Sequence, residues 1–265
     1  MTIDLLAFGA HPDDAEIGAA GTLIRAARGG SRTGIVTLTR GEMGTRGDVA
    51  ARAAEFDAAA DAMGLAHHAM LGLPDGRLAC DEAAREAVVR VLRDLRPSVV
   101  LAPYWEDRHP DHAAASRIVQ EAVFLAGLGR LDTGQEPFRP AEVVYYMAAW
   151  EFEPSFVVDI SGQFERKLAV LRCYASQVYV PDRRSSEPGT FISSEHYWEL
   201  LSARAAHCGR RIGKAYGEPF RILKGRAIAF VLVAAYFGLG QLSPVAGAIA
   251  GLVLFAVFPW LIVKS

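Results

Sequence analysis

The chain has 265 residues, enough for one α/β domain with a full hydrophobic core and a short additional segment. It carries 28 basic and 30 acidic side chains, a formal net charge of -2, and so lacks the concentrated basic face that nucleic-acid binding requires. Its three cysteines form no CxxC pair, which argues against a disulfide framework and a thiolate zinc site. The N-terminus has neither a basic leader nor a secretory hydrophobic region, and we expect a cytoplasmic protein.

Short apolar runs alternate with longer amphipathic runs through the first half of the chain. The short runs predict strands, because turn residues bound them, and the longer runs predict helices that end at glycines or before a proline. Strands separated by helices pair in parallel through right-handed crossovers. We therefore expect an α/β fold with a Rossmann-like, doubly wound, mostly parallel sheet and helices on both faces. The predicted strands are 3–8, 33–38, 67–71 and 98–102, and the predicted helices are 16–28, 50–63 and 82–95.

The second half of the chain continues the alternation with three helices and two strands. Two segments rich in Gly, Pro or polar residues predict loops, and the later one has the character of a mobile surface segment or lid. In open parallel sheets, ligands bind at the carboxyl ends of strands near a switch in strand order, so functional residues should follow the first and fourth strands. The predicted helices are 112–126, 163–176 and 194–213, the strands 142–148 and 155–160, and the loops 127–140 and 181–189.

Both of these strand ends carry imidazoles beside carboxylates. Residues 9–18 read GAHPDDAEIG after the first strand, and residues 104–112 read YWEDRHPDH after the fourth. Zinc prefers imidazole nitrogen and carboxylate oxygen, and a catalytic zinc keeps one position open for water, whereas magnesium prefers mostly oxygen ligands. Two such clusters at equivalent strand ends therefore predict a zinc site. Spacing alone leaves open which member of each cluster is the ligand: His109 or His112, Asp13 or Asp14.

The two clusters also carry a family resemblance. AHPDDAEIG followed by HPDH resembles the LmbE-like (PIG-L) N-acetylglucosaminyl deacetylase superfamily, which removes acetate from glucosamine conjugates using zinc on a Rossmann-like fold. The similarity runs from residue 3 to about residue 220. Further segments, in this order, resemble the branch of bacillithiol biosynthesis, the N-acetyl-α-D-glucosaminyl L-malate deacetylases. The segments are AFGAHPDDAEIG at 7–18, LTRGEMGTRG at 38–47, LGLPDG at 71–76, PYWEDRHPDH at 103–112, VDIS at 158–161 and YASQV at 174–178.

The resemblance implies a role for each residue of the two clusters. His11, Asp14 and His112 would bind zinc, or iron(II), which tolerates the same ligands. Asp13 would be the general base that takes a proton from the attacking water. His109, in its protonated form, would stabilise the oxyanion, and either His109 or Asp13 would protonate the departing amine.

Other charged residues near these motifs are implied as substrate contacts or supports. Arg46, Arg52 and Arg108 could bind sugar hydroxyls or malate carboxylates, since a guanidinium can bind a carboxylate through two hydrogen bonds. Asp111 could hold an imidazole in one tautomer, or simply favour a helix N-terminus. Relatives in the mycothiol branch place a tyrosine where this chain has Asp107, which weakens a mycothiol assignment.

The C-terminal end differs in composition from the rest of the chain. Residues 227–263 carry no charged side chain, and about twenty apolar residues suffice to cross a bilayer. We therefore expect a deacetylase domain over residues 1–222 and a hydrophobic tail over residues 223–265, a candidate membrane tether or a fusion remnant. Arg221, Lys224 and Arg226, just before the uncharged stretch, fit a cytoplasmic flank. A buried hairpin or an oligomer contact is the alternative.

The predicted function is zinc-dependent hydrolysis of the acetamide of GlcNAc-malate to GlcN-malate and acetate, in bacillithiol biosynthesis. The alternatives are deacetylation or amide hydrolysis of another glucosamine conjugate, such as a bacillithiol S-conjugate or a GlcNAc-inositol. A non-catalytic, nucleotide-binding Rossmann domain is a more distant alternative, because the first turn lacks the G-x-G-x-x-G pattern. Relatives are often hexameric, so the resemblance also implies a homo-oligomer.

Overall fold

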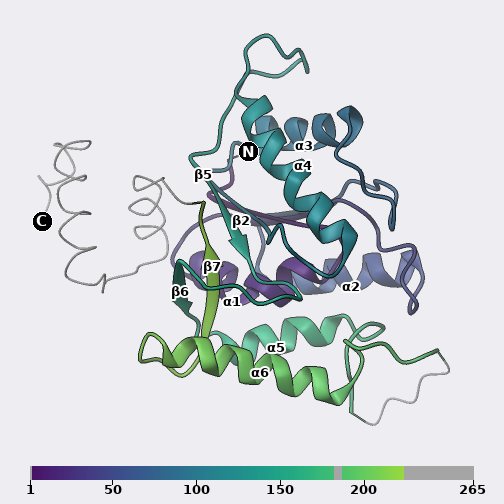
Figure 1. The fold of residues 1–265 in the computed structure, drawn as a ribbon, viewed down its shortest axis with the longest axis vertical. Coiled ribbons are helices and arrows are strands. Elements are labelled where there is room, and N and C mark those ends of the chain that lie inside the picture. The colour runs from purple at the N-terminus through teal and green to yellow at the C-terminus, as the bar shows by residue number, and fades with distance from the viewer. Residues whose placement is uncertain (1, 182–186, 224–265) are drawn as a thin grey trace, which may run out of the picture. The chain divides into compact units, whose positions relative to one another are not determined.

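The computed structural model describes residues 2–181 and 187–223. Within this part of the chain, seven strands form one sheet of order β3-β2-β1-β4-β5-β7-β6 (Figure 1). Strands β1 to β5 pair in parallel, and β7 runs antiparallel to both of its neighbours. The predicted mostly parallel α/β fold is therefore confirmed. The strands are β1 (Leu5–Gly9), β2 (Thr33–Thr37), β3 (His67–Met70), β4 (Val99–Pro103), β5 (Glu142–Tyr146), β6 (Phe156–Asp159) and β7 (Gly217–Arg221).

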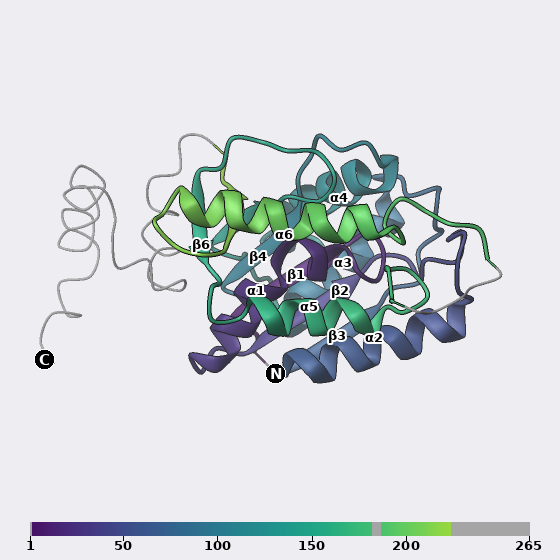
Figure 2. The ribbon, with the colours of Figure 1, turned by 90° about the horizontal axis from the view of Figure 1, so that it is seen from below.

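Helices cover both faces of the sheet (Figure 1 and Figure 2). Helices α3 and α4 pack together on one face, whereas α1 and α2 lie on the other, and α5 packs against both of the latter. Because both faces are covered, every residue of β1, β2 and β4 is buried, as is usual for parallel strands. The helices are α1 (Asp14–Arg28), α2 (Val49–Met63), α3 (Glu82–Leu95), α4 (Pro110–Ala126), α5 (Phe164–Cys173) and α6 (Glu195–Arg210).

Strand β7 is an element that the sequence did not predict. Pro219 lacks a backbone N–H and argues against a strand, yet it lies opposite Val157 in the register between β7 and β6. Phe220 lies opposite Tyr146 of β5. The chain therefore returns from α6 to insert β7 between two strands that precede it in sequence.

The order of the strands reverses between β1 and β4, which are neighbours in the sheet. From β1 the chain proceeds through α1 to β2 on one side, and from β4 through α4 to β5 on the other. Such a switch opens a crevice at the carboxyl ends of the two strands. Both histidine–aspartate motifs begin at this crevice, since they follow Gly9 and Pro103, the last residues of β1 and β4.

A buried ion pair fixes α1, the helix that starts at the first motif. Glu218 of β7 accepts hydrogen bonds from the backbone N–H groups of Gly21 and Thr22 at 2.9 and 2.8 Å, in the middle of the helix. Lys167 of α5 donates to Glu218 at 2.6 Å and to the carbonyl oxygen of Ile17 at 2.7 Å. In a regular helix, that carbonyl and the N–H of Gly21 would pair with each other. The two charged groups therefore attach α1 to β7 and α5 at the level of its backbone.

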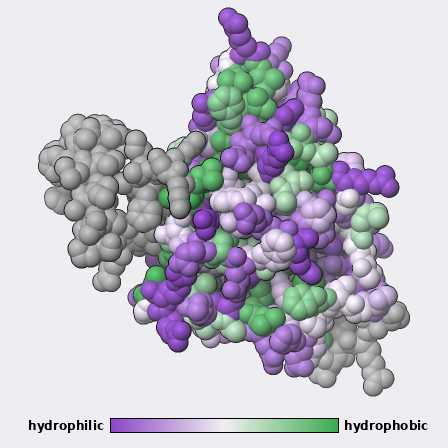
Figure 3. Space-filling view, viewed as in Figure 1, coloured by the Kyte–Doolittle hydropathy of each residue, from purple (hydrophilic) through white to green (hydrophobic). Residues whose placement is uncertain are grey.

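The described part of the chain has a mixed surface. Figure 3 shows hydrophobic residues in small groups among hydrophilic ones on this face of the molecule. None of the helices among the described residues has the length and hydrophobicity that a membrane span needs. The predicted tail lies outside the described residues from position 224 onward, as do residues 182–186 of the predicted lid. The domain boundary at residue 222 and the membrane tether therefore stay predictions.

Candidate metal centre and active site

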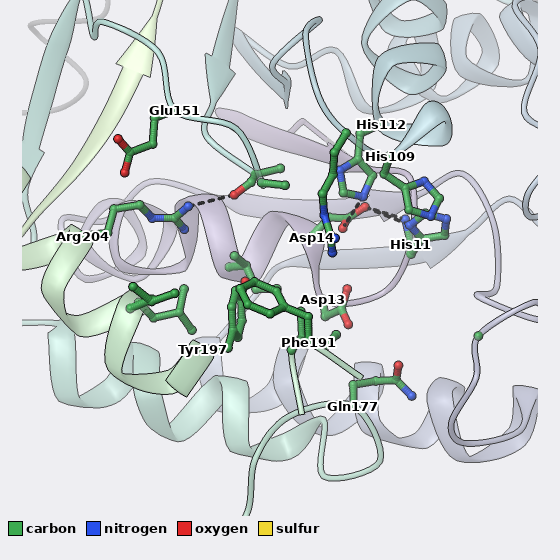
Figure 4. Close-up of a pocket in the computed structure, with 18 of the residues that line it drawn as sticks. His11, Asp13, Asp14, His109, His112, Glu151, Gln177, Phe191, Tyr197 and Arg204 are labelled. Atoms are coloured by element: carbon green, nitrogen blue, oxygen red, sulfur yellow. Dashed lines mark hydrogen bonds and ion pairs between the residues drawn. The ribbon is translucent and has the colours of Figure 1, made fainter. Parts of the chain in front are cut away.

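Two imidazoles and a carboxylate meet at the crevice between β1 and β4. His11 lies in the turn after β1, Asp14 is the first residue of α1, and His112 lies in the first turn of α4. Asp14 lies between the two rings, with one oxygen 3.4 Å from His11 Nδ1 and the other 3.1 Å from His112 Nε2. The backbone N–H of His11 also donates to Asp14 at 2.8 Å, which fixes the carboxylate in the turn. Figure 4 shows the three side chains converging at one end of a pocket.

The donor set fits a divalent metal ion. Among the described residues, two overlapping groups offer ligand atoms within 4.8 Å of one another: His11, His109 and His112, and His11, Asp75 and Asp111. Burial alone would lower the pKa of His11, but hydrogen bonds with Asp111, Asp14 and Asp75 raise it to about 12. The carboxylates that attract a proton to this imidazole would equally attract a metal cation, and two histidines favour zinc-type metals over magnesium.

The structure distinguishes the two histidines of the HPDH motif. His112 directs Nε2 at Asp14, whereas His109 caps α4, with its Nδ1 accepting the backbone N–H of Asp111 at 3.2 Å. The two rings stack with their centroids 4.8 Å apart. His112 therefore directs a ring nitrogen at the first motif, whereas the Nδ1 of His109 is engaged by its own helix. The metal-binding role of His112 stays a prediction.

Asp107 holds the far side of the His112 ring. Its Oδ1 lies 3.0 Å from His112 Nδ1 and accepts the backbone N–H of His109 at 2.9 Å. Its Oδ2 accepts the backbone N–H groups of Ala149 and Trp150 at 2.8 and 3.3 Å. Burial would raise the pKa of Asp107, but the hydrogen bonds from His112 and the backbone hold it below its ordinary value. Asp107 is not among the site residues predicted from the sequence, although it stands five residues before His112.

Replacing Asp107 with asparagine should weaken zinc binding by about 10–100-fold, because the carboxylate orients the ligating imidazole and raises its basicity. Competition with a chromophoric chelator measures the affinity. Glu106→Gln is the matched control, since Glu106 is the exposed neighbour and should leave the affinity unchanged. Equal affinities in the wild type and Asp107→Asn would show that this carboxylate does not support a metal ligand.

Two carboxylates hold the other side of the His11 ring. His11 Nε2 lies 3.0 Å from Asp75 Oδ1 and 3.4 Å from Asp111 Oδ2. Asp111 also accepts the backbone N–H groups of Gly76 and Leu78, so it links α4 to the loop after β3. Asp111 therefore contacts the imidazole of His11, and its role in fixing the tautomer of that ring stays a prediction. Asp75, in the LGLPDG segment, is a member of the site that the sequence analysis missed.

Asp13 lies beside the candidate metal ligands His11, Asp14 and His112 and is buried at the pocket wall. Its backbone is left-handed, with φ 107°, a region in which Asp and Asn are tolerated better than most residues. Arg52 Nη2 lies 3.5 Å from Asp13 Oδ2 and donates to the carbonyl oxygen of Pro12 at 2.6 Å. Burial raises the pKa of Asp13 to about 6, although Arg52 opposes the shift. A carboxylate with such a pKa can exchange protons near neutral pH.

The resemblance implies a protonated His109, and the surroundings of this ring disfavour protonation. Burial, together with the neighbouring charges of His11 and His112, lowers the pKa of His109 below its ordinary value. Because its Nδ1 accepts the N–H of Asp111, the neutral ring carries its proton on Nε2. In its neutral form, His109 would offer the pocket an N–H donor at Nε2.

The three predicted substrate arginines lie in different surroundings. Arg108 lines the pocket, with its guanidinium 5.6 Å from the ring centre of Phe191. Arg52 also lines it, but its guanidinium is occupied by Pro12, Asp13 and Gln177. Arg46 is buried outside the pocket lining and donates to the carbonyl oxygens of Ser176 and Pro188 at 2.7 and 3.4 Å. Arg46 therefore supports the segments around Ser176 and Pro188 and does not face the pocket.

Comparison with known proteins identifies the family. A family model described as GlcNAc-PI de-N-acetylase (PIG-L) matches residues 6–123. The chain is 31% identical to a diacetylchitobiose deacetylase of Thermococcus kodakarensis over 234 residues, which cover 81% of each chain. It is 30% identical to a 1D-myo-inositol 2-acetamido-2-deoxy-alpha-D-glucopyranoside deacetylase of Catenulispora acidiphila, covering 76% of this chain and 89% of the relative. The protein belongs to the PIG-L (LmbE-like) superfamily.

Solved structures agree with this assignment. A conserved protein of Thermus thermophilus matches with 40% identity and a TM-score of 0.76, covering 83% of this chain and 94% of the other. The N,N'-diacetylchitobiose deacetylase of Pyrococcus horikoshii, solved with an inhibitor, matches with 28% identity and a TM-score of 0.73, covering 84% of each chain. A second family model, described as a bacterial protein of unknown function (DUF898), matches residues 215–265, a range that includes the predicted tail.

Proposed function

We propose that the protein is a metal-dependent N-deacetylase that hydrolyses the acetamide of a glucosamine conjugate. The observation that carries this proposal is that His11, Asp14 and His112 converge beside the buried carboxylate of Asp13 in one pocket. Metal ligands with an adjacent general base are what amide hydrolysis needs. The relatives named as deacetylases of chitobiose and of a GlcNAc-inositol support the same substrate class.

His11, Asp14 and His112 would hold zinc, or iron(II), through two imidazole nitrogens and one carboxylate. The bound ion would supply Lewis acidity to the acetamide oxygen and to water. Asp107 would keep His112 Nδ1 occupied, and Asp75 and Asp111 would do the same for His11 Nε2. The nitrogens that face Asp14 are thereby left as the ligand atoms.

Asp13 is the group that moves the protons. It accepts a proton from water as the water oxygen bonds to the acetamide carbon, and it returns that proton to the nitrogen as the C–N bond breaks. The products are acetate and the free amine. The raised pKa of Asp13, about 6, supports both transfers, because burial makes its protonated form accessible. Asp13 is a better proton donor to the amine than His109, whose neutral ring holds only the Nε2 proton.

His109 donates its Nε2–H to the carbonyl oxygen as negative charge develops there. Its Nδ1 is fixed by the backbone of Asp111, so the donor edge is directed at the pocket without rearrangement. A donor fixed in this way stabilises the charge that forms during the reaction more than it stabilises the neutral substrate.

Within this substrate class, GlcNAc-malate is the substrate that the resemblance to the bacillithiol branch predicts. Arg108 lines the pocket, and its guanidinium can bind a malate carboxylate or sugar hydroxyls, whereas the guanidinium of Arg52 is held by Pro12, Asp13 and Gln177. A GlcNAc-inositol, a chitobiose or a bacillithiol S-conjugate is the alternative, and the names of the relatives favour the first two. The predicted homo-oligomer stays a prediction.

Acetate release from a panel of GlcNAc conjugates tests the proposed function. We expect the zinc-supplemented protein to release acetate from at least one of GlcNAc-malate, a GlcNAc-inositol and N,N'-diacetylchitobiose. Chelation followed by gel filtration should abolish the release, and added zinc should restore it, because the ligands alone cannot activate water. If the chelated protein still released acetate although elemental analysis found no metal in it, the metal dependence would be overturned. A metal-loaded protein that releases no acetate from any of the three would overturn the substrate class.

A further inference from the structure

The pocket extends well beyond the groups that hydrolysis uses. Its volume is about 770 Å³, in the upper part of the roughly 300–1,000 Å³ range of ligand pockets. Figure 4 shows the metal candidates and Asp13 at one end and Arg204 with Glu151 at the other, with Tyr197 and Phe191 between them. A sugar whose acetamide reaches Asp13 therefore leaves the outer part of the pocket to its aglycone.

One face of α6 builds this outer part. Tyr197, Leu200, Leu201, Arg204 and His207 all line the pocket. Side chains separated by three or four residues and their multiples share one face of a helix, and these five follow that spacing. At about 1.5 Å per residue, the helix carries Arg204 roughly 10 Å beyond Tyr197. Along this face the lining changes from aromatic and aliphatic to basic.

The apolar part of the lining is exposed and supported from behind. Phe191 and Leu200 are 50% and 42% exposed, although they lie in a pocket. Behind them, Leu201 packs with Ile17 of α1 in a buried cluster, and Tyr197 packs against it. Exposed apolar side chains in a groove with a rigid base favour an apolar ligand. A small polar aglycone would leave both of them in contact with water.

Arg204 is held in place at the basic end of this face. Its Nη1 donates to the carbonyl oxygen of Ala148 at 2.8 Å, which fixes the guanidinium at the pocket wall. Within residues 2–181 and 187–223 its hydrogen bond is to this carbonyl, and Glu151, which lines the same end of the pocket, forms no ion pair with it. A guanidinium has five N–H donors in a fixed plane, so several remain for an anionic group of the ligand.

We propose that the outer part of the pocket is an aglycone subsite for GlcNAc conjugates whose aglycone has an apolar body of about aromatic size and a terminal acidic group. The apolar body packs on Phe191, Tyr197 and Leu200, and Arg204 binds the acidic group. This subsite rests on the proposed deacetylase function, which places the acetamide at the opposite end. It deepens that function by naming the substrate class within GlcNAc conjugates.

Acetate release from methyl, phenyl and 4-carboxyphenyl glycosides of GlcNAc, each as both anomers, tests the subsite. The wild type should prefer phenyl to methyl, and 4-carboxyphenyl to phenyl by about tenfold in kcat/KM, the effect of one hydrogen bond to a charged group. Arg204→Met should remove the preference for the carboxylate, and Arg204→Lys should retain part of it. Leu200→Asn should reduce the preference for phenyl. Arg210→Met is the matched control, since Arg210 lies exposed on the same helix outside the pocket lining.

Binding of the matching glucosamine glycosides by calorimetry separates the subsite from the chemistry. Two results would overturn the subsite and leave the deacetylase function standing. One is acetate release that does not depend on the aglycone. The other is a carboxylate preference that Arg204→Met and Arg210→Met retain equally. A carboxylate preference in binding that Arg204→Met removes, without acetate release from any glycoside or from the three conjugates of the earlier panel, would support the subsite and overturn the deacetylase function. If the protein showed neither a binding preference nor acetate release from any of these compounds, both the subsite and the deacetylase function would be overturned.

Discussion

Asp13→Asn should lower kcat for acetate release by about 10²–10⁴-fold, the usual contribution of a general acid–base group. Asparagine keeps the size of the side chain and tolerates the left-handed backbone at φ 107°, so the fold should persist. It cannot accept a proton from water or return one to the amine. Because His11, Asp14 and His112 remain, elemental analysis should still find one metal ion per chain.

Comparison with Asp14→Asn, the same change at the next residue, makes the result for Asp13→Asn specific. Asp14→Asn alters the carboxylate that lies between His11 and His112, so it should lower metal content together with turnover. Asp57→Asn, an exposed change on α2, should alter neither. If Asp13→Asn retained more than about a tenth of wild-type kcat, the proposed proton transfers would have to be assigned to another group.

His109→Ala should lower kcat by about 10²–10³-fold, because it removes a donor to the developing oxyanion. KM should change much less than kcat, since the hydrogen bond strengthens as charge develops on the oxygen. His109→Gln retains a side-chain N–H and should recover part of the loss. Steady-state kinetics on one GlcNAc conjugate, with metal content measured on the same samples, gives all of these values.

Metal content decides between the two histidines of the HPDH motif. We expect His109→Ala to retain the ion and His112→Ala to lose it, because of these two rings it is His112 that directs a nitrogen at Asp14. The His109 side chain also caps α4, so thermal unfolding should register a loss of about 1 kcal/mol. His196→Ala is the matched surface control. If His109→Ala lost the metal, His109 would be a ligand and not an oxyanion donor.

The sequence predicted the parallel part of the fold well, because its signals are local. Short apolar runs between capped helices gave β1 to β6 within a few residues, and right-handed crossovers implied the sheet. Strand β7 was not predicted, because Pro219 disfavours a strand in the local sequence. Pairing with β5 and β6, which are distant in sequence, stabilises this strand. The ion pair between Lys167 and Glu218 depends on the same long-range packing.

The candidate site also contains residues that local motifs predict and residues that only long-range packing brings together. The two motifs follow adjacent strands, so the meeting of His11, Asp14 and His112 followed from topology. Asp75 could not be placed, because its contact with His11 depends on the loop after β3. Arg46 was expected at the substrate, but the backbone oxygens that bind it become neighbours only in the folded chain. The pocket face of α6 likewise depends on how that helix packs against α1.

The position of a bound ion tests the central claim most directly. Crystals grown with zinc, measured at the zinc absorption edge, should show one anomalous peak per chain within about 2.0–2.2 Å of His11 Nδ1, His112 Nε2 and an Asp14 oxygen. The side chain of Asp13 should lie beside the ion without binding it. A peak held instead by His11, Asp75 and Asp111, or one that also binds His109, would contradict the account, since these residues form the two groups of ligand atoms that lie within 4.8 Å of one another.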